Sequence, residues 1–223
     1  MNEQNVHILM VDDHPSMIEG YKSILSYNDL GCNIQVTAAH NCKDAYNIIT
    51  KTDDIYSFQM AFIDLSLPSF EEKQINSGED IAKLVKSRFP NTRIVILTSH
   101  AEAFILYKIQ KKISPDGILV KSDFTADEFL IAFEKILNGD KYVSKTVTQS
   151  IDDLLSNEVF LDEYNRQLIT LLSKGIKSKN LPNYINLSMS AIDKRKAQIK
   201  DYFCIQKGTD EDIIREAKKH GFI

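Results

Sequence analysis

The stretch Val6-His7-Ile8-Leu9-Met10-Val11-Asp12-Asp13-His14-Pro15 decides the fold. Its first six residues are mostly apolar, which is typical of a strand that is buried on both faces. Two carboxylates, Asp12 and Asp13, stand at the end of this strand, and Pro15 is suited to the first turn of a helix. In an open parallel sheet the site lies at the carboxyl ends of the strands, so the pattern predicts an acidic site there.

Short β-branched runs and amphipathic segments alternate from this stretch to about residue 139. A helix follows each predicted strand, and the last helix opens on a capping box of Thr125 and Glu128 and ends at Gly139. The strands are predicted over residues 6–11, 34–38, 60–63, 93–97 and 117–120. This order predicts an α/β fold, a doubly wound five-stranded parallel sheet with helices on both faces.

Chemically related side chains stand at the ends of four of these strands. Asp12 and Asp13 end the first, Asp64 the third, Thr98 the fourth and Lys121 the fifth. Three carboxylates in one place repel each other unless a cation lies among them, and Mg²⁺ is the hard, oxygen-binding candidate. With a lysine and a hydroxyl nearby, the set suits phosphoryl transfer, in which Asp64 would be the nucleophile that forms an acyl phosphate.

The motifs at these strand ends resemble the receiver domain of two-component response regulators. The matching motifs are Val11-Asp12-Asp13-His14-Pro15, Asp64-Leu65-Ser66-Leu67-Pro68, Leu97-Thr98-Ser99 and Leu119-Val120-Lys121. The resemblance implies that Asp64 is the phosphoacceptor, that Thr98 is the switch hydroxyl and that Lys121 pairs with the phosphoryl group. It also implies a Mg²⁺ site formed by Asp12, Asp13, Asp64 and the backbone carbonyl of Ser66.

Two features depart from the family pattern, and one histidine is ambiguous. Family members usually carry an aromatic residue three positions before the lysine, where this chain has Ile118, so the usual coupling of that residue to Thr98 is in doubt. Residues 69–77 look partly inserted before Gly78. We interpret them as a tolerated surface insertion, with capping of the site or discrimination among kinases as alternatives. We interpret His14 as a turn residue rather than a phosphoacceptor or metal ligand.

The last third of the chain has a different pattern. Residues 140–157 are polar, and we expect a linker there with a helical turn or two. The predicted domains are therefore 1–139 (receiver), 140–157 (linker) and 158–223 (a small all-α domain), with helices near 162–173, 178–184, 189–202 and 210–220. Gly175 can end the first of these helices and Ser188 can cap the third. A short helix, a turn and a basic helix predict a helix-turn-helix.

Residues 161–223 resemble the LuxR-type DNA-binding domain, so that the whole chain is similar to NarL-type response regulators. The motifs are Gly175-x-x-Ser178-Lys179-x-Leu181, Leu187-Ser188, Ala191-Ile192 and Ala217-x-x-x-Gly221-Phe222-Ile223. Asp193 and Pro182 depart from the family pattern. The resemblance implies DNA contacts by Lys179, Ser190, Lys194, Arg195 and Gln198, with Arg195 and Gln198 as candidates for base edges. It also implies dimerisation through Ile213, Ile214 and Ala217, with packing inside their own domain as the alternative.

Composition agrees with a cytoplasmic protein that has an acidic site and a basic tail. Residues 1–155 hold 15 Lys and Arg against 22 Asp and Glu, whereas residues 156–223 hold 12 against 9. A basic tail favours a polyanionic partner, although the excess is small. No apolar run approaches the length of a transmembrane helix and no signal peptide is recognisable. The three cysteines form no CxxC pair, so neither a disulfide framework nor a zinc site is expected.

These observations predict a transcriptional regulator that is switched by aspartyl phosphorylation. A histidine kinase would donate the phosphoryl group, and the phosphorylated chain would bind double-stranded DNA as a homodimer. The chain would catalyse only its own phosphorylation and dephosphorylation, so it is not expected to be an enzyme for an external substrate. One alternative is a phosphorylation-dependent protein-interaction switch that does not bind DNA. The other is a Mg²⁺-dependent phosphatase, although such enzymes carry the nucleophile on their first strand.

Overall fold

The computed structural model describes residues 5–52, 57–156, 162–203, 205 and 208–223. The chain divides into two compact units, the first comprising residues up to 101 with 108–148 and the second comprising 102–107 with 149–223. The predicted boundary between residues 157 and 158 lies outside the described residues. Within the described part of the chain, no helix combines the length and hydropathy that crossing a membrane requires.

The first unit is built on a six-stranded sheet whose order is β2-β1-β3-β4-β5-β6, with every neighbouring pair parallel. The strands are β1 (Asn5–Val11), β2 (Asn33–Ala39), β3 (Met60–Asp64), β4 (Arg93–Thr98), β5 (Gly117–Val120) and β6 (Tyr142–Val143). The doubly wound parallel sheet is confirmed, and the predicted count of five is one strand short. Strand β6 pairs with Gly117 and Ile118 and has only two residues, too few for an alternating pattern to reveal it.

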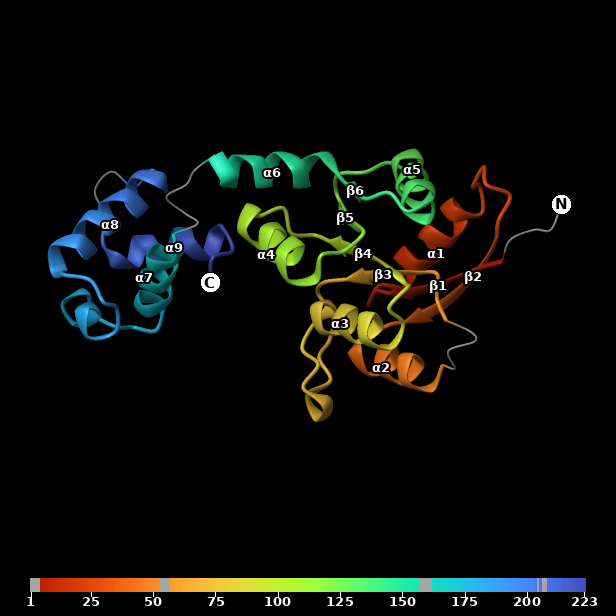
Figure 1. The fold of residues 1–223 in the computed structure, drawn as a ribbon, viewed down its shortest axis with the longest axis horizontal. Helices are drawn as coiled ribbons and strands as arrows, with labels where there is room; N and C mark the ends of the chain where they lie inside the picture. Colours follow the sequence, from red (N-terminus) through yellow and green to blue (C-terminus); the bar gives the residue numbers. More distant parts are fainter. Residues whose placement is uncertain (1–4, 53–56, 157–161, 204, 206–207) are drawn as a thin grey trace. The chain divides into compact units, whose positions relative to one another are not determined.

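Helices cover both faces of this sheet. The helices are α1 (Pro15–Leu25), α2 (Cys42–Lys51), α3 (Gly78–Arg88), α4 (Ala103–Ile113) and α5 (Ala126–Leu137). Helices α1 and α5 lie on one face, and α2 and α3 lie together on the other (Figure 1). Alternate strand residues such as Ile8, Met10 and Phe62 point into the α1/α5 core, where the Phe62 and Phe129 rings lie 5.1 Å apart. This burial fixes the register that aligns the strand ends.

The sequence signals for the ends of α5 are confirmed. Thr125 accepts a hydrogen bond from the Glu128 amide, and the Glu128 side chain accepts one from the Thr125 amide, which is a capping box. Gly139 follows the helix with φ of 102°, a conformation that favours glycine. Cys42 begins α2 inside the core, and burial raises the pKa of its thiol to about 11. A buried thiol with a raised pKa is a poor nucleophile.

The segment expected to be mostly irregular linker is a strand followed by a helix. After β6, helix α6 runs over Lys145–Ser156, where only a turn or two of helix was expected. Val147 and Ile151 are buried and lie four residues apart, on one side of the helix. The three residues between them, Thr148, Gln149 and Ser150, are all polar, so the apolar stripe is short. The prediction of a turn or two of helix was therefore too short for this segment.

Residues 69–77 form a small hairpin between β3 and α3 (Figure 1). Phe70 and Ile75 form an antiparallel bridge around the 3-10 helix η2 (Glu71–Lys73), and Gln74 turns the chain with φ of 55°. The Phe70 ring is buried against Tyr46 of α2, with ring centroids 5.7 Å apart. The insertion is therefore a structured element anchored to α2.

From residue 162 onward, the described part of the second unit contains four helical elements in the predicted order. They are α7 (Glu163–Ser173), the 3-10 helix η4 (Ser178–Asn183), α8 (Met189–Tyr202) and α9 (Asp210–Lys219). Ser188 caps α8 through the Ala191 amide, as predicted. Pro182 lies inside η4, and because proline lacks an N–H this element does not continue as an α-helix. The core is formed by Leu168, Ile169, Leu172, Leu181, Ile185, Ile192, Ile199, Ile213 and Ala217.

Candidate functional site

The parallel register brings the predicted strand-end residues of the first unit together. Asp64 pairs with Leu97, and Thr98 pairs with Val120, so the ends of β3, β4 and β5 lie level with one another. Lys121 follows β5, and its Nζ atom lies 2.7 Å from Asp12 Oδ2 and 2.8 Å from Asp64 Oδ2. Asp12 is 2% exposed and Asp64 is 3% exposed, so Lys121 neutralises two carboxylates that are shielded from water.

The electrostatics of these groups follow from their burial and separation. Burial alone would lower the pKa of Lys121, but the hydrogen bonds and negative charges of Asp12 and Asp64 outweigh it and raise that pKa above its ordinary value. Burial raises the pKa of the Tyr21 hydroxyl, and the charges of Asp12 and Asp64 raise it further. The site therefore keeps a permanent positive charge between two carboxylates.

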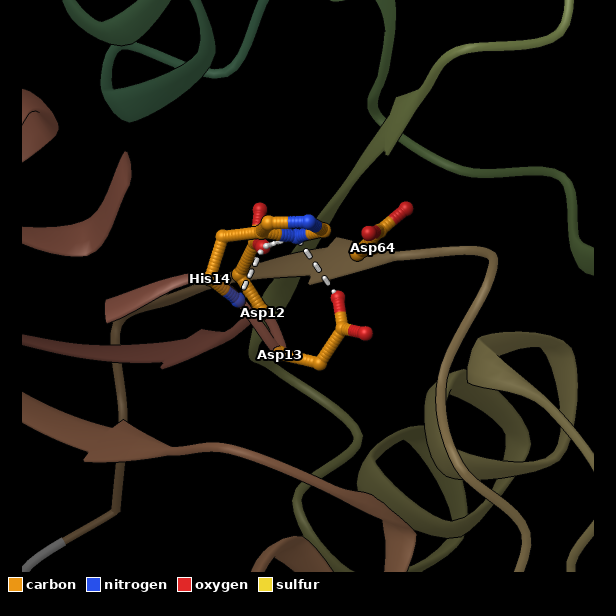
Figure 2. A group of neighbouring side chains, drawn as sticks. All are labelled: Asp12, Asp13, His14 and Asp64. Atoms are coloured by element: carbon orange, nitrogen blue, oxygen red, sulfur yellow. Dashed lines mark hydrogen bonds and ion pairs between the residues drawn. The ribbon is translucent and has the colours of Figure 1, made fainter. Parts of the chain in front are cut away.

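Four side chains gather at this edge in a group that can hold a metal ion (Figure 2). Asp12, Asp13, His14 and Asp64 each offer one ligand atom, and these atoms lie within 4.8 Å of one another. Asp13 Oδ1 is buried and receives no hydrogen bond from any residue that the structure describes, although His14 Nδ1 lies 2.8 Å away. A buried carboxylate oxygen without a donor is stabilised by a cation, so the residues fit a hard divalent ion such as Mg²⁺.

Ser66 and Thr98 lie on the loops beside the acidic residues. The Ser66 amide donates to Asp64 Oδ1 over 3.2 Å, which orients the carboxylate together with Lys121. Thr98 is fully buried, and its hydroxyl oxygen accepts a hydrogen bond from the His100 amide over 3.0 Å. The His100 ring in turn lies 3.5 Å from the Ser66 hydroxyl. Ser66, Thr98 and His100 thus connect the loops after β3 and β4. Ile118, at the position where an aromatic residue is usual, is buried inside β5.

A doubly wound sheet that carries buried aspartates and one bridging lysine at its carboxyl edge defines the receiver class of signalling domain. The model of the response regulator receiver domain family matches residues 8–134, more than half of the chain. The chain therefore belongs to the response regulator receiver family.

Relatives and solved structures of similar architecture extend over most of the chain. The oxygen regulatory protein NreC of Staphylococcus haemolyticus is 23% identical over 204 residues, covering 86% of this chain and 88% of that protein. RcsB of Salmonella enterica serovar Typhimurium, bound to promoter DNA with the phosphomimetic BeF₃⁻, superposes with a TM-score of 0.68 at 19% identity, covering 96% and 98% of the two chains. A LuxR-family response regulator from an Aurantimonas species covers 69% of this chain with a TM-score of 0.56 at 25% identity, and 99% of its own chain is covered.

The predicted DNA contacts of the second unit differ in how accessible they are. Lys179 on η4 is exposed, and so are Ser190 and Lys194 at the start of α8. Gln198 is half-buried. Asp193 is exposed next to Lys194, so the outer face of α8 carries an acidic charge beside its basic one.

Arg195 is engaged inside the second unit. Its guanidinium donates to Asp162 Oδ2 over 2.7 Å and to Asn165 Oδ1 over 3.0 Å, and it lies 5.0 Å from the centre of the Tyr164 ring. Desolvation would raise the pKa of Asp162, but the hydrogen bond and charge of Arg195 and the Tyr164 amide hold it below its ordinary value. In this arrangement Arg195 joins α8 to the start of α7 and is not presented to a base edge.

The three residues predicted to dimerise have unequal exposure. Ile213 and Ala217 are fully buried in the core of the second unit, whereas Ile214 is half-buried. This placement agrees with the alternative in which Ile213 and Ala217 pack inside their own domain. A contact with another copy through α9 would therefore depend on Ile214 and its exposed neighbours.

Two imidazoles, those of His14 and His40, lie at the phosphoacceptor edge. His14, which was interpreted as a turn residue, belongs to the group that can hold a metal ion. His40 Nδ1 lies 3.3 Å from the Asp12 carbonyl oxygen. The signal available for His14 was its position directly after the Asp pair. His40 lies in the loop after β2, and only the β1–β2 pairing brings it near Asp12.

Proposed function

We propose that the chain is a DNA-binding transcriptional regulator that is switched by phosphorylation of Asp64. The observation that carries the proposal is the position of Lys121 Nζ, within hydrogen-bonding distance of both Asp12 and Asp64 at a buried edge that also holds Asp13. A positive charge held between two carboxylates is ready to pair with the oxygens of an incoming phosphoryl group. A histidine kinase in the cytoplasm is the proposed donor.

The chemistry at Asp64 is a transfer of one phosphoryl group. An Asp64 carboxylate oxygen forms a bond to phosphorus while the bond between phosphorus and the donor's nitrogen or oxygen breaks, and the donor leaves with the electron pair. Lys121 neutralises negative charge on the transferred group. The Thr98 hydroxyl, whose oxygen accepts from the His100 amide, donates its proton to one oxygen of that group. Mg²⁺, held by Asp12, Asp13, Asp64 and the Ser66 carbonyl, supplies further charge neutralisation when bound.

The second unit is the proposed DNA-binding part, with domains over 1–139 and 158–223 and a connection over 140–157. Support comes from the helix-turn-helix order of η4 and α8, from the exposed Lys179, Ser190 and Lys194, and from the likeness to RcsB, whose structures include DNA complexes. Phosphorylation would shift an existing equilibrium toward a homodimer that binds DNA. Gln198 is the remaining candidate for a base edge, because Arg195 is engaged by Asp162.

The deciding experiment compares wild type with Asp64→Asn, each with and without Mg²⁺ and a small acyl phosphate. Intact mass reports whether one phosphoryl group is added, and selection from random duplex DNA followed by binding across a salt series reports DNA recognition. We expect that only phosphorylated wild type binds tightly and as a dimer, with affinity that falls steeply with salt. If Asp64→Asn gains a phosphoryl group to the same extent as wild type, Asp64 is not the phosphoacceptor.

A phosphorylation-dependent protein-interaction switch is the second candidate, and a specific observation favours it. The exposed side of α8 carries Asp193, Lys194, Ala197 and Asp201, while Lys196 pairs with Asp210 inside the unit. These four residues carry one positive and two negative charges, which is unfavourable for a helix that enters a DNA groove. Phosphorylation of wild type without salt-sensitive binding to any duplex would establish this candidate over the first.

A further inference from the structure

Helix α8 presents an acidic residue, Asp193, in the first half of its outward face. The apolar residues Ile192 and Ile199 point the other way, into the core of the second unit. Residues at helical spacing share one side of a helix, and the exposed residues opposite that core are Ser190, Asp193, Lys194, Ala197 and Asp201. If α8 enters a DNA groove, this outward face meets the edges of the bases.

The Asp193 carboxylate makes no hydrogen bond or ion pair with any residue that the structure describes. It does not cap its own helix, because the cap is Ser188, whose hydroxyl accepts from the Ala191 amide. Asp193 lies beyond the first turn, where an acidic residue stabilises a helix most. The carboxylates of Asp162 and Asp210, by contrast, pair with basic residues of the same helix. The structure therefore gives Asp193 no role in holding the second unit together.

The chemistry of an unpaired carboxylate selects one base in the major groove. A carboxylate is repelled by DNA phosphates, so it cannot contribute to affinity through the backbone. Cytosine presents an amino donor, N4, whereas guanine and thymine present acceptors, and adenine places the acceptor N7 beside its amino group. Ala197, one turn after Asp193, is small, so the helix can approach the base edges closely at this point.

We propose that Asp193 reads a cytosine in the operator, by accepting a hydrogen bond from its N4 amino group. The proposal rests on the DNA binding of the proposed function. Opposite any other base the carboxylate stays unpaired in the negative potential of the groove, so Asp193 rejects wrong bases as well as binding the right one. The acidic charge on α8 thereby lowers affinity for unrelated DNA and raises discrimination at one base pair.

The test is selection from random duplex DNA with the phosphorylated full-length protein, followed by affinity measurements on the selected sequence and its single-base variants. For wild type we expect one position at which replacing cytosine weakens binding by about tenfold or more. In Asp193→Ala the same replacement should change affinity by less than about twofold, because the partner of the cytosine is gone. Asp193→Asn should prefer adenine at this position, because an amide side chain pairs with adenine N6 and N7.

Asp201→Ala is the matched control, because Asp201 is exposed on the same face further along α8. Both alanine variants remove one negative charge, so both should bind unrelated DNA more tightly than wild type, but Asp201→Ala should keep every base preference. Urea denaturation checks that each variant is folded. If wild type selects a sequence in which no cytosine is required, or if both Asp193 variants keep the wild-type preferences, the role of Asp193 is wrong while DNA binding stands. If wild type selects no sequence at all, the proposed DNA binding fails as well.

Discussion

The Cα atom of Gly78 lies so close to the backbone carbonyl of Asp64 that a side chain on residue 78 would overlap that carbonyl oxygen. Gly78 begins α3, and its amide donates to the Leu65 carbonyl over 3.0 Å. The position of Asp64 therefore depends on residue 78, fourteen residues later in the chain, being a glycine, which has no side chain.

Gly78→Ala is expected to displace Asp64 and to abolish most of its phosphorylation. Overlap with backbone atoms cannot be relieved by a rotamer change, and we expect a loss of about 1–3 kcal/mol in the free energy of unfolding. Mass spectrometry after acyl phosphate treatment measures the first effect, and urea denaturation measures the second. Gly20→Ala is the control. It lies in α1 with nothing within 4 Å of the added carbon, so it should stabilise the chain by up to about 1 kcal/mol.

Lys121→Met should destabilise the first unit and make its stability depend strongly on Mg²⁺. The side chain is 12% exposed and bridges two buried carboxylates, so its loss leaves charge unpaired at a cost of about 3 kcal/mol. Mg²⁺ should restore more stability to this variant than to wild type, as measured by thermal unfolding across Mg²⁺ concentrations. Lys83→Met, which breaks a surface pair with Glu79, should cost less than about 1 kcal/mol. Equal Mg²⁺ responses in the two variants would contradict this account of Lys121.

Phe70→Ala should detach the hairpin of residues 69–77 from α2. The substitution removes the contact with Tyr46 and the cation–π contact with Lys43, and we expect a loss of about 2 kcal/mol, below the ~3–5 typical of a core phenylalanine. Hydrogen exchange of the Phe70 and Ile75 amides, which bond across the hairpin, should become much faster. Glu72→Ala, at the exposed tip, should leave both measurements unchanged.

Arg195→Ala is expected to lower the stability of the second unit, whereas Lys194→Ala is expected to weaken DNA binding. Loss of Arg195 removes charged hydrogen bonds to Asp162 and Asn165, and we expect the second unit to lose about 1.5–3 kcal/mol. Loss of the exposed Lys194 should leave stability within about 0.5 kcal/mol. It should also reduce the salt dependence of DNA binding by about one phosphate contact. If Arg195→Ala changes base preference without affecting stability, Arg195 instead contacts bases.

The Asp162–Arg195 pair should make the second unit sensitive to acid. The pKa of Asp162 is held below its ordinary 3.8 in the folded chain, so the pair stabilises the fold above pH 3.8 and this stabilisation is lost as the pH falls through the lower, folded pKa. The difference in unfolding free energy between wild type and Asp162→Asn should be constant near neutral pH and shrink below pH 3.8. NMR signals of α7 and α8 during urea titration measure it. A difference that persists at lower pH would show that the carboxylate charge is not what stabilises the unit.

The elements that could be predicted from sequence are those specified by local patterns. Strand ends followed from apolar runs, and the cap of α5 followed from the spacing of Thr125 and Glu128. The parallel sheet then implied that Asp12, Asp64 and Lys121 would meet, because strand ends of one sheet share an edge.

Features that the sequence did not predict are of two kinds. Some depend on side-chain partners that are distant in sequence, and others are segments too short to show the periodicity of a helix or strand. The pair of Arg195 with Asp162 could not be predicted, because Asp162 lies 33 residues earlier and no local signal links the two. The hairpin of residues 69–77 is organised by Tyr46 of another helix. Strand β6 has two residues, and the apolar stripe of α6 has only Val147 and Ile151 fully inside the described core.

Strand β6 has a consequence for how the chain avoids self-association. The β5 side of the sheet would otherwise expose four residues of unpaired backbone, a template on which another chain can add a strand. Pairing with Tyr142 and Val143 replaces that template with an edge of two residues, too short to recruit a partner strand efficiently. The shortest strand of the sheet thus reduces the backbone that this one edge offers to another chain.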